Sequence, residues 1–310
     1  MIISVLTIMP DLFDSFLQAP VIARAVRNGV LRVEIIDIRE YAPGSFRHID
    51  DSPFGGGAGM VMRCQPVLDA LRACKKRNYS ALSENRKDFP EDRKNQSENR
   101  KKQSENRREE DCASDFMKNQ PENRKEKDCA SDFMKDRAAE QAAPQNDVRT
   151  VILSPAGRPY SQKKAHDFAE TDHLILICGH YEGMDARIYP HADEQVSIGD
   201  YVLTGGELAA QVIIDSVARL LPGSLRDAST QEESFENGLL EYPQYTQPAV
   251  YEGEAVPEVL RSGDHEKIRK WRLQQSLLLT RKMRPDLFAA HELTKEEQAL
   301  LEEAPPPVHL

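Results

Sequence analysis

Short apolar runs alternate with helical patterns along most of this chain of 310 residues, and this alternation limits its possible folds more than any other feature. We expect strands at residues 2–9, 31–38, 148–154, 174–178 and 201–203. Helices are expected at residues 11–18, 21–27, 66–74, 161–170, 207–221 and 264–283. Strands separated by helices form parallel sheets with helices on both faces. The sequence therefore predicts an α/β fold with a mostly parallel sheet, which would bind ligands beyond the carboxyl ends of its strands.

Residues 75–147 interrupt this alternation with a polar, repetitive segment. Only 16 of its residues are apolar, and its 18 Lys and Arg residues nearly balance its 17 Asp and Glu residues. The octapeptide DCASDFMK occurs twice, and SENRK-like units recur. Because so little apolar surface cannot offset the entropy of ordering, we expect a disordered insertion. The rest of the chain is expected to form a first domain over residues 1–223, a flexible linker over 224–250 and a helical domain over 251–310.

Composition argues against several classes of protein. No apolar run approaches the roughly 20 residues that span a bilayer, and the N-terminus lacks the basic segment of a secretory signal, so we expect a cytoplasmic protein. The five cysteines lack the CxxC spacing that is typical of zinc and redox sites. The net charge is −10, so contact with nucleic acid would require a local basic patch.

Glycine-rich stretches indicate a ligand site. The first, DSPFGGGAGM at residues 51–60, matches neither the Walker A nor the GxGxxG pattern. The others are LSPAG at 153–157, CGHYEG at 178–183 and SIGDYVLTGGE at 197–207. Glycine lets the backbone approach a ligand closely, and Glu182 could pair with an ammonium group. Tight turns between packed elements would explain any one stretch, but together the stretches favour a pocket.

A basic helix gives this acidic chain a local positive field. Residues 267–284 contain seven Lys and Arg residues and no carboxylate. We expect Lys267, Lys270 and Arg272 to contact phosphates, as basic patches do in nucleic-acid-binding proteins. A solvated helix face is the alternative interpretation.

Taken together, these motifs resemble the bacterial tRNA (guanine-37-N1)-methyltransferases of the SPOUT superfamily. The resemblance covers residues 1–74 and 148–303 and includes DSPFGGGAGM, LSPAGR, CGHYEG, SIGDYVLTGGELAA, SVAR, GLLEYPQYTQP and VPEVLRSGDHEKIRKWRLQQSLLLT. It implies a deep trefoil knot, a small α-helical C-terminal domain and methyl transfer from S-adenosylmethionine to N1 of guanine-37 in tRNA. It also implies a homodimer whose active site is shared between protomers. The family is described as needing Mg²⁺, although no ligand cluster in this sequence predicts a metal site.

The resemblance also assigns roles to individual residues. S-adenosylmethionine would be bound by Leu153, Ser154, Pro155, Gly157, Gly179, Glu182, Ile198, Gly199, Tyr201, Leu203, Gly205 and Gly206. The anticodon region of the tRNA would contact Asp51, Gly55, Gly56, Gly57 and Gly59, together with the basic helix. Glu233 would be the base that removes the N1 proton, and Arg219 would stabilise the charge that develops on O6.

Two positions depart from the family pattern. Glu233 stands where the family usually has Asp, so the carboxylate is kept on a side chain with one more methylene. Gln247 stands where the family usually has Arg. Two alternatives therefore stay open: an RNA-binding scaffold without catalysis, and a SPOUT methyltransferase with a different RNA target.

Overall fold

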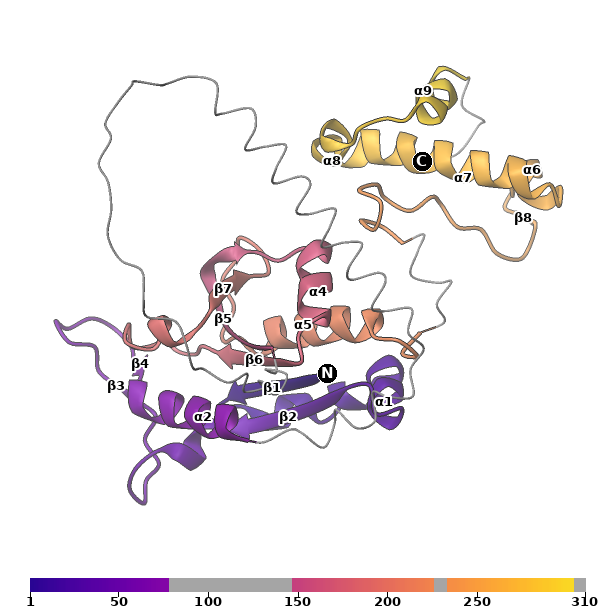
Figure 1. The fold of residues 1–310 in the computed structure, drawn as a ribbon. Helices are drawn as coiled ribbons and strands as arrows, with labels where there is room; N and C mark the ends of the chain where they lie inside the picture. Colours follow the sequence, from indigo (N-terminus) through magenta and orange to yellow (C-terminus); the bar gives the residue numbers. More distant parts are fainter. Residues whose placement is uncertain (78–146, 226–232, 304–310) are drawn as a thin grey trace, which may run out of the picture. The chain divides into compact units, whose positions relative to one another are not determined.

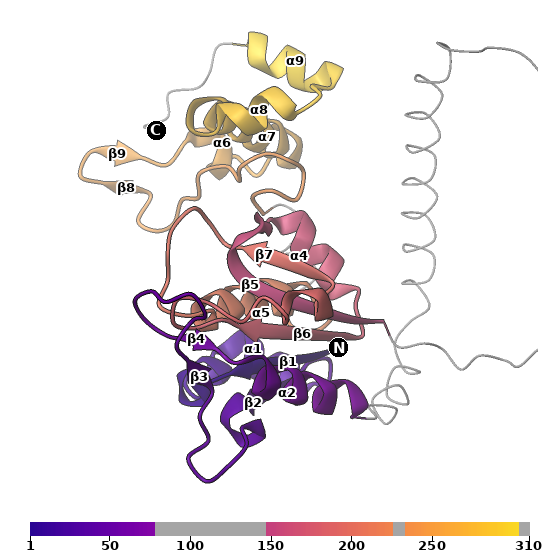
Figure 2. The ribbon, with the colours of Figure 1, turned by 90° about the vertical axis from the view of Figure 1, so that its left-hand side faces the viewer.

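Five parallel strands form the main sheet of the protein. The computed structural model describes residues 1–77, 147–225 and 233–303. The strands are β1 (Ile2–Thr7), β2 (Arg32–Asp37), β5 (Val148–Pro159), β6 (His173–Cys178) and β7 (Glu194–Ser197). Their order is β2-β1-β6-β5-β7, which can be followed in Figure 2, and all neighbouring pairs are parallel. The predicted α/β class and parallel sheet are confirmed.

Two apolar layers cover the two faces of this sheet, and Figure 1 shows the helices that flank it. On one face, α1 (Pro20–Arg27), α4 (Gln162–Ala169) and α5 (Glu207–Leu220) pack on strand residues such as Val5 and Leu176. On the other face, α2 (Cys64–Lys76) packs on residues such as Leu6 and Ile177. Successive strand residues point to opposite faces, so a sheet buried on both faces requires continuous apolar strands.

The predicted fifth strand at residues 201–203 is wrong. These residues lie in a loop, and the fifth strand of the sheet is β7. Val196 in β7 is 1% exposed, whereas Val202 is 86% exposed. The apolar triplet therefore lines a surface pocket and does not enter the core.

Other local differences concern short elements. The predicted helix at 11–18 is replaced by two 3-10 helices, η1 (Pro10–Phe13) and η2 (Phe16–Gln18). A small hairpin, β3 (Asp50–Asp51) and β4 (Val61–Met62), flanks the first glycine-rich stretch and was not predicted. Two further 3-10 helices are η3 (Ile38–Tyr41) and η6 (Tyr189–His191). The helix before the predicted insertion, α2, continues to Lys76.

The described C-terminal residues are mostly helical. They form β8 (Val250–Tyr251), β9 (Glu254–Ala255), α6 (Glu258–Arg261), α7 (His265–Met283), α8 (Pro285–Ala290) and α9 (Lys295–Glu302). The predicted helix at 264–283 is confirmed as α7, which begins after the N-cap Asp264. The Leu240 N–H donates to Thr280 Oγ1 of α7 at 2.8 Å, and Gln274 of α7 donates to the Leu300 carbonyl of α9 at 2.7 Å.

Residues 78–146 of the predicted insertion and residues 226–232 of the predicted linker lie outside the described part of the chain. Within the part that is described, no helix is both long and apolar enough to cross a membrane.

Candidate active site

A bulge interrupts β5 where it runs beside β7. Leu153 and Arg158 both pair with Val196, so residues 154–157 leave the strand register between them. Gly157 is packed tightly against β7, since a Cβ atom there would lie 2.4 Å from the Val196 backbone. The bulge thus pushes its first residues out of the sheet while Gly157 holds it in place.

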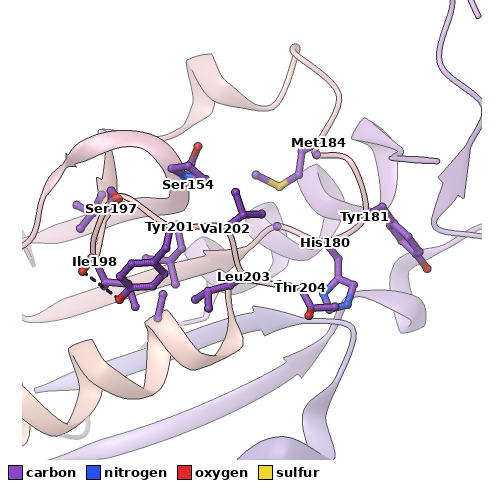
Figure 3. A pocket seen from close by; sticks show the side chains of 18 of the residues that line it. Ser154, His180, Tyr181, Met184, Ser197, Ile198, Tyr201, Val202, Leu203 and Thr204 are labelled. Carbon is purple, nitrogen blue, oxygen red and sulfur yellow. Dashed lines mark hydrogen bonds between the residues drawn. The ribbon is translucent and has the colours of Figure 1, made fainter. Parts of the chain in front are cut away.

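A pocket of about 190 Å³ opens where this bulge meets the loops that follow β6 and β7. The predicted cofactor residues that line it are Leu153, Ser154, Pro155, Gly179, Glu182, Ile198, Gly199, Tyr201, Leu203, Gly205 and Gly206. Gly157 is the one member of the predicted set that does not line it. Figure 3 shows Tyr201 and Ile198 at one end of the pocket and His180 and Tyr181 at the other. The structure therefore brings three separate sequence motifs together.

The backbone approaches its neighbours very closely at Gly205 and Gly206. A Cβ atom on Gly205 would lie 2.2 Å from His180 Nδ1 and 2.3 Å from Glu207 Oε2. A Cβ atom on Gly206 would lie 2.8 Å from the Cα of Cys178. Neither position can accept a side chain unless the wall of the pocket moves.

A buried carboxylate supports this wall. Glu207 is 2% exposed and is the first residue of α5, where the helix dipole favours negative charge. Thr7 Oγ1 donates to Glu207 Oε1 at 2.7 Å, and His180 Nδ1 lies 3.4 Å from Glu207 Oε2. Burial, and to a lesser degree the Glu207 carboxylate, raise the pKa of the Cys178 thiol well above its usual range. A thiol held in its neutral form is a poor nucleophile.

Arg219 and Glu233, the predicted cation and base, form an ion pair within one chain. Arg219 Nη2 donates to Glu233 Oε1 at 2.5 Å, and the two side chains are 35% and 31% exposed. The segment that follows is attached to α4, because Glu236 accepts a hydrogen bond from Gln162 at 2.7 Å and contacts His166 Nε2 at 2.9 Å. The structure thus places the two predicted catalytic groups side by side.

This ion pair lies far from the pocket of its own chain. Gly206 lines the pocket and directly precedes α5, whereas Arg219 lies in the last turn of that helix. Ala209 of α5 also lines the pocket, and at a rise of roughly 1.5 Å per residue Arg219 lies about 15 Å further along the helix. The pocket and the ion pair are therefore separated along α5 within one chain.

The glycine-rich stretch that was predicted to meet tRNA is exposed. Its exposed members include the predicted residues Asp51, Gly55, Gly56, Gly57 and Gly59. The four glycines have φ angles between 79° and 137°, which is a backbone region that side chains disfavour. Phe54, next to them, is also fully exposed. This stretch presents backbone and one aromatic ring at the surface.

The positive field of α7 is weaker than its sequence predicts. Lys267 Nζ lies 3.1 Å from Asp264, and Lys270 Nζ lies 3.9 Å from Glu266. Both carboxylates come from the residues just before the run of basic residues. The two lysine side chains stay 74% and 50% exposed, so they can still reach a phosphate.

Two arginines of α7 have other partners. The Arg272 guanidinium lies over the ring of Tyr242, 4.8 Å from its centre, so this predicted phosphate contact is partly used in packing. Arg269 pairs with Glu296 of α9, which is distant in sequence. Folding therefore neutralises part of a charge run that looks uncompensated in the sequence.

Sequence reasoning missed several residues of the pocket. These are His180, Tyr181, Gly183, Met184, Tyr189, Val196, Ser197, Val202, Thr204 and Ala209. His180 and Tyr181 lie within CGHYEG, and Val202 and Thr204 lie within SIGDYVLTGGE, so the motifs already contained the signal. Tyr189 belongs to no motif, and its sequence context gave no signal.

Comparison with known proteins identifies the family. The family model described as tRNA (Guanine-1)-methyltransferase TrmD matches residues 1–104 and 131–290. A tRNA (guanine-N(1)-)-methyltransferase of Clostridium perfringens (strain ATCC 13124) is 38% identical over 300 residues, covering 96% of this chain and 98% of the relative. Another, from Clostridium botulinum (strain Kyoto / Type A2), is 37% identical over 302 residues, covering 97% of each. The chain therefore belongs to the tRNA (guanine-1)-methyltransferase TrmD family.

Proposed function

We propose that this protein transfers a methyl group from S-adenosylmethionine to N1 of guanine-37 in tRNA, next to the anticodon. S-adenosylmethionine is the methyl donor of this family. The observation that carries the proposal is the meeting of three motif-bearing loops at one pocket in a chain of this family. A tRNA substrate supports the further proposal that the protein acts in the cytoplasm.

The pocket has the character of a site for an adenosyl group. Leu153, Ile198 and Leu203 supply apolar surface for a flat ring, and Gly205 and Gly206 bring backbone polar groups to its edge. We propose that the predicted lining residues bind the cofactor directly, and that Gly157 contributes by holding the bulge against β7. When bound, S-adenosylmethionine would supply an electrophilic methyl group.

No step is assigned to Mg²⁺, which the family resemblance implies. In the three described ranges, no group of three or more His, Cys, Asp and Glu side chains is placed to hold a metal ion. The acidic residues present there do not form a protein cage for the ion, and the chain's own contribution to the proposed chemistry is that of Arg219 and Glu233.

Two groups of the chain suit the chemistry at guanine. N1 carries a proton at neutral pH and becomes nucleophilic as that proton leaves. The Glu233 carboxylate would accept the proton while N1 attacks the methyl group in line, as the bond from that methyl group to the sulfonium sulfur breaks and S-adenosylhomocysteine leaves. Negative charge would develop on O6, where the Arg219 guanidinium would donate hydrogen bonds. The ion pair at 2.5 Å keeps both groups together, as the adjacent N1 and O6 positions require.

We also propose a homodimer in which each active site uses both protomers. The separation of the pocket and the Arg219–Glu233 pair in one chain supports this, because a partner would have to supply the pair. Leu208 and Val212 of α5 are 56% and 46% exposed, and they lie on the same helix face as Arg219. Packing two such helices antiparallel would bury both apolar side chains and bring the partner's ion pair to the pocket.

The deep trefoil knot and the separate tRNA-binding domain over residues 251–310 are part of the same proposal. The loop after β7 passes directly beside the loop after β6, since the Gly206 N–H donates to the Gly179 carbonyl at 2.9 Å. His180 and Gly205 also form an isolated bridge between these loops. Direct contact between these two loops is a feature that a threaded arrangement would require.

Cofactor binding should be sensitive to a methyl group at position 205. Gly205→Ala would press on His180 and Glu207, so we expect S-adenosylmethionine affinity to fall about tenfold or more. Gly179→Ala should lose less, because the nearest atom to its new Cβ is Met184 Cε at 3.6 Å. Isothermal calorimetry on variants with unchanged thermal unfolding measures both. Equal losses, or undiminished binding by Gly205→Ala, would contradict this account of the pocket wall.

The basic helix should act on tRNA and leave the cofactor unaffected. Replacing Lys267, Lys270 and Arg272 by Gln should reduce the log–log salt slope of tRNA binding by up to about 2–3, since each phosphate contact contributes roughly 0.7–0.9. Arg72→Gln is the control, because Arg72 on α2 has a similar carboxylate partner three residues away. If the triple variant keeps the full salt slope, the basic residues of α7 do not contact phosphates and only face solvent.

The test of the proposed function is methylation of a tRNA transcript that has guanine at positions 36 and 37. We expect 1-methylguanosine at position 37, and none when adenine replaces that guanine. Binding of the transcript without methylation would favour the scaffold. Methylation of a different RNA alone would favour the other SPOUT activity.

A further inference from the structure

The glycine-rich stretch is joined to the pocket by a short backbone ladder. The Met62 N–H donates to the Gly183 carbonyl at 3.0 Å, and the Asp185 N–H donates to the Met62 carbonyl at 2.9 Å. Met62 and Met184 form a parallel bridge, and Met62 is fully buried. The segment after the glycines is thus paired with the loop that lines the pocket.

Glu182 extends this ladder toward the glycines and adds a side chain to it. Its backbone N–H donates to the Met60 carbonyl at 3.2 Å. Its carboxylate Oε2 accepts a hydrogen bond from the Met60 N–H at 2.8 Å. One residue of the pocket thus binds both backbone polar groups of Met60. The bond to the carboxylate is the stronger of the two, because hydrogen bonds to a charged group are stronger than neutral ones.

The backbone at Gly59 passes very close to the same Glu182 carboxylate. A Cβ atom on Gly59 would lie 1.8 Å from Glu182 Oε1, and its φ is 83°. Gly55 has a similar φ of 90°, but nothing lies within 4 Å of where its Cβ would be. Both glycines have a positive φ that side chains disfavour. Only at Gly59 would a side chain also collide with the Glu182 carboxylate.

We infer that Glu182 is a positioning residue that fixes the glycine-rich stretch against the cofactor pocket through Met60 and Gly59. This inference rests on the proposed function, in which that stretch receives the tRNA. A single carboxylate then links the surface that meets the target guanine to the pocket that holds the methyl donor. Glu182 also lines the pocket. Its hydrogen bond to the Met60 N–H is a separate contact that does not require a bound cofactor.

A double-mutant cycle tests this link. Glu182→Ala should weaken tRNA binding by roughly ten- to a hundredfold, the usual scale for a lost hydrogen bond to a charged group. Gly59→Ala should cost more than Gly55→Ala in the wild-type background, because only the first displaces Glu182. In the Glu182→Ala background the two alanines should cost the same, since the carboxylate is absent. Fluorescence anisotropy with labelled tRNA gives these affinities without requiring methyl transfer.

The conservative variant separates positioning from charge. Glu182→Gln keeps an oxygen that can accept from the Met60 N–H, so it should recover most of the tRNA affinity that Glu182→Ala loses. Equal costs of Gly59→Ala with and without Glu182, or no recovery by Gln, would overturn the inference. A wild-type protein that binds tRNA but does not methylate it would overturn the proposed function. The double-mutant cycle could still be measured, because it uses only tRNA affinities. A wild-type protein that binds no tRNA would overturn both.

Discussion

Glu233→Gln should slow the methyl-transfer step by roughly 10²–10⁴-fold, the usual range for general acid–base catalysis. The glutamine amide has almost the size of the carboxylate and can still accept a hydrogen bond from Arg219. It cannot take the proton from N1, so the guanine stays a poor nucleophile. Single-turnover rates at saturating tRNA and S-adenosylmethionine measure this step without interference from product release.

Two neighbouring variants give this prediction its controls. Glu233→Asp restores the residue that the family usually has, and we expect it to remain active with a shorter reach toward Arg219. Glu232→Gln changes the adjacent carboxylate, which lies outside the described residues. Near wild-type turnover by Glu233→Gln together with an inactive Glu232→Gln would move the role to Glu232. Near wild-type rates for both would remove carboxylate catalysis from the mechanism.

The strands that the sequence predicts best are those whose side chains are buried on both faces. All six residues of β1 and of β6 are buried, which produces the continuous apolar runs that were recognised. β7 was missed because only Val196 and Ser197 of its four residues are buried. The triplet at 201–203 is more apolar than β7, but its side chains line the surface pocket. Local hydrophobicity alone does not distinguish residues that line a pocket from residues of a strand in the core.

Contacts between distant residues could not be read from the sequence. Thr7 and Glu207 share a buried hydrogen bond across the length of the first domain, and Arg269 pairs with Glu296 on another helix. The glycine-rich motifs predicted a pocket because glycines allow close approaches of the backbone, and the family resemblance implied its individual residues. They did not show that the Glu182 carboxylate binds the Met60 N–H, since that bond joins two motifs that are far apart in the chain.

Mixing two inactive variants, Gly205→Leu and Arg219→Ala, should restore methylation. In a mixed dimer, one active site would combine the intact pocket of the Arg219→Ala chain with the intact ion pair of the Gly205→Leu chain. Random exchange makes half of the dimers mixed, and each has one complete site of two, so activity should rise to about a quarter of wild type. Activity measured before and after subunit exchange checks this, with dimer formation followed by size-exclusion chromatography.

A second mixture tests whether the Arg219 and Glu233 side chains of one active site come from the same protomer. Arg219 and Glu233 are paired at 2.5 Å within one chain, so mixing Arg219→Ala with Glu233→Gln should restore nothing. Each site of that mixed dimer would receive one intact and one altered member of the pair. Recovery in this mixture would mean that the two residues reach a site from different chains. Failure of the first mixture, despite exchanged dimers, would mean that one chain supplies both pocket and pair, which the span of about 15 Å from Ala209 to Arg219 along α5 argues against.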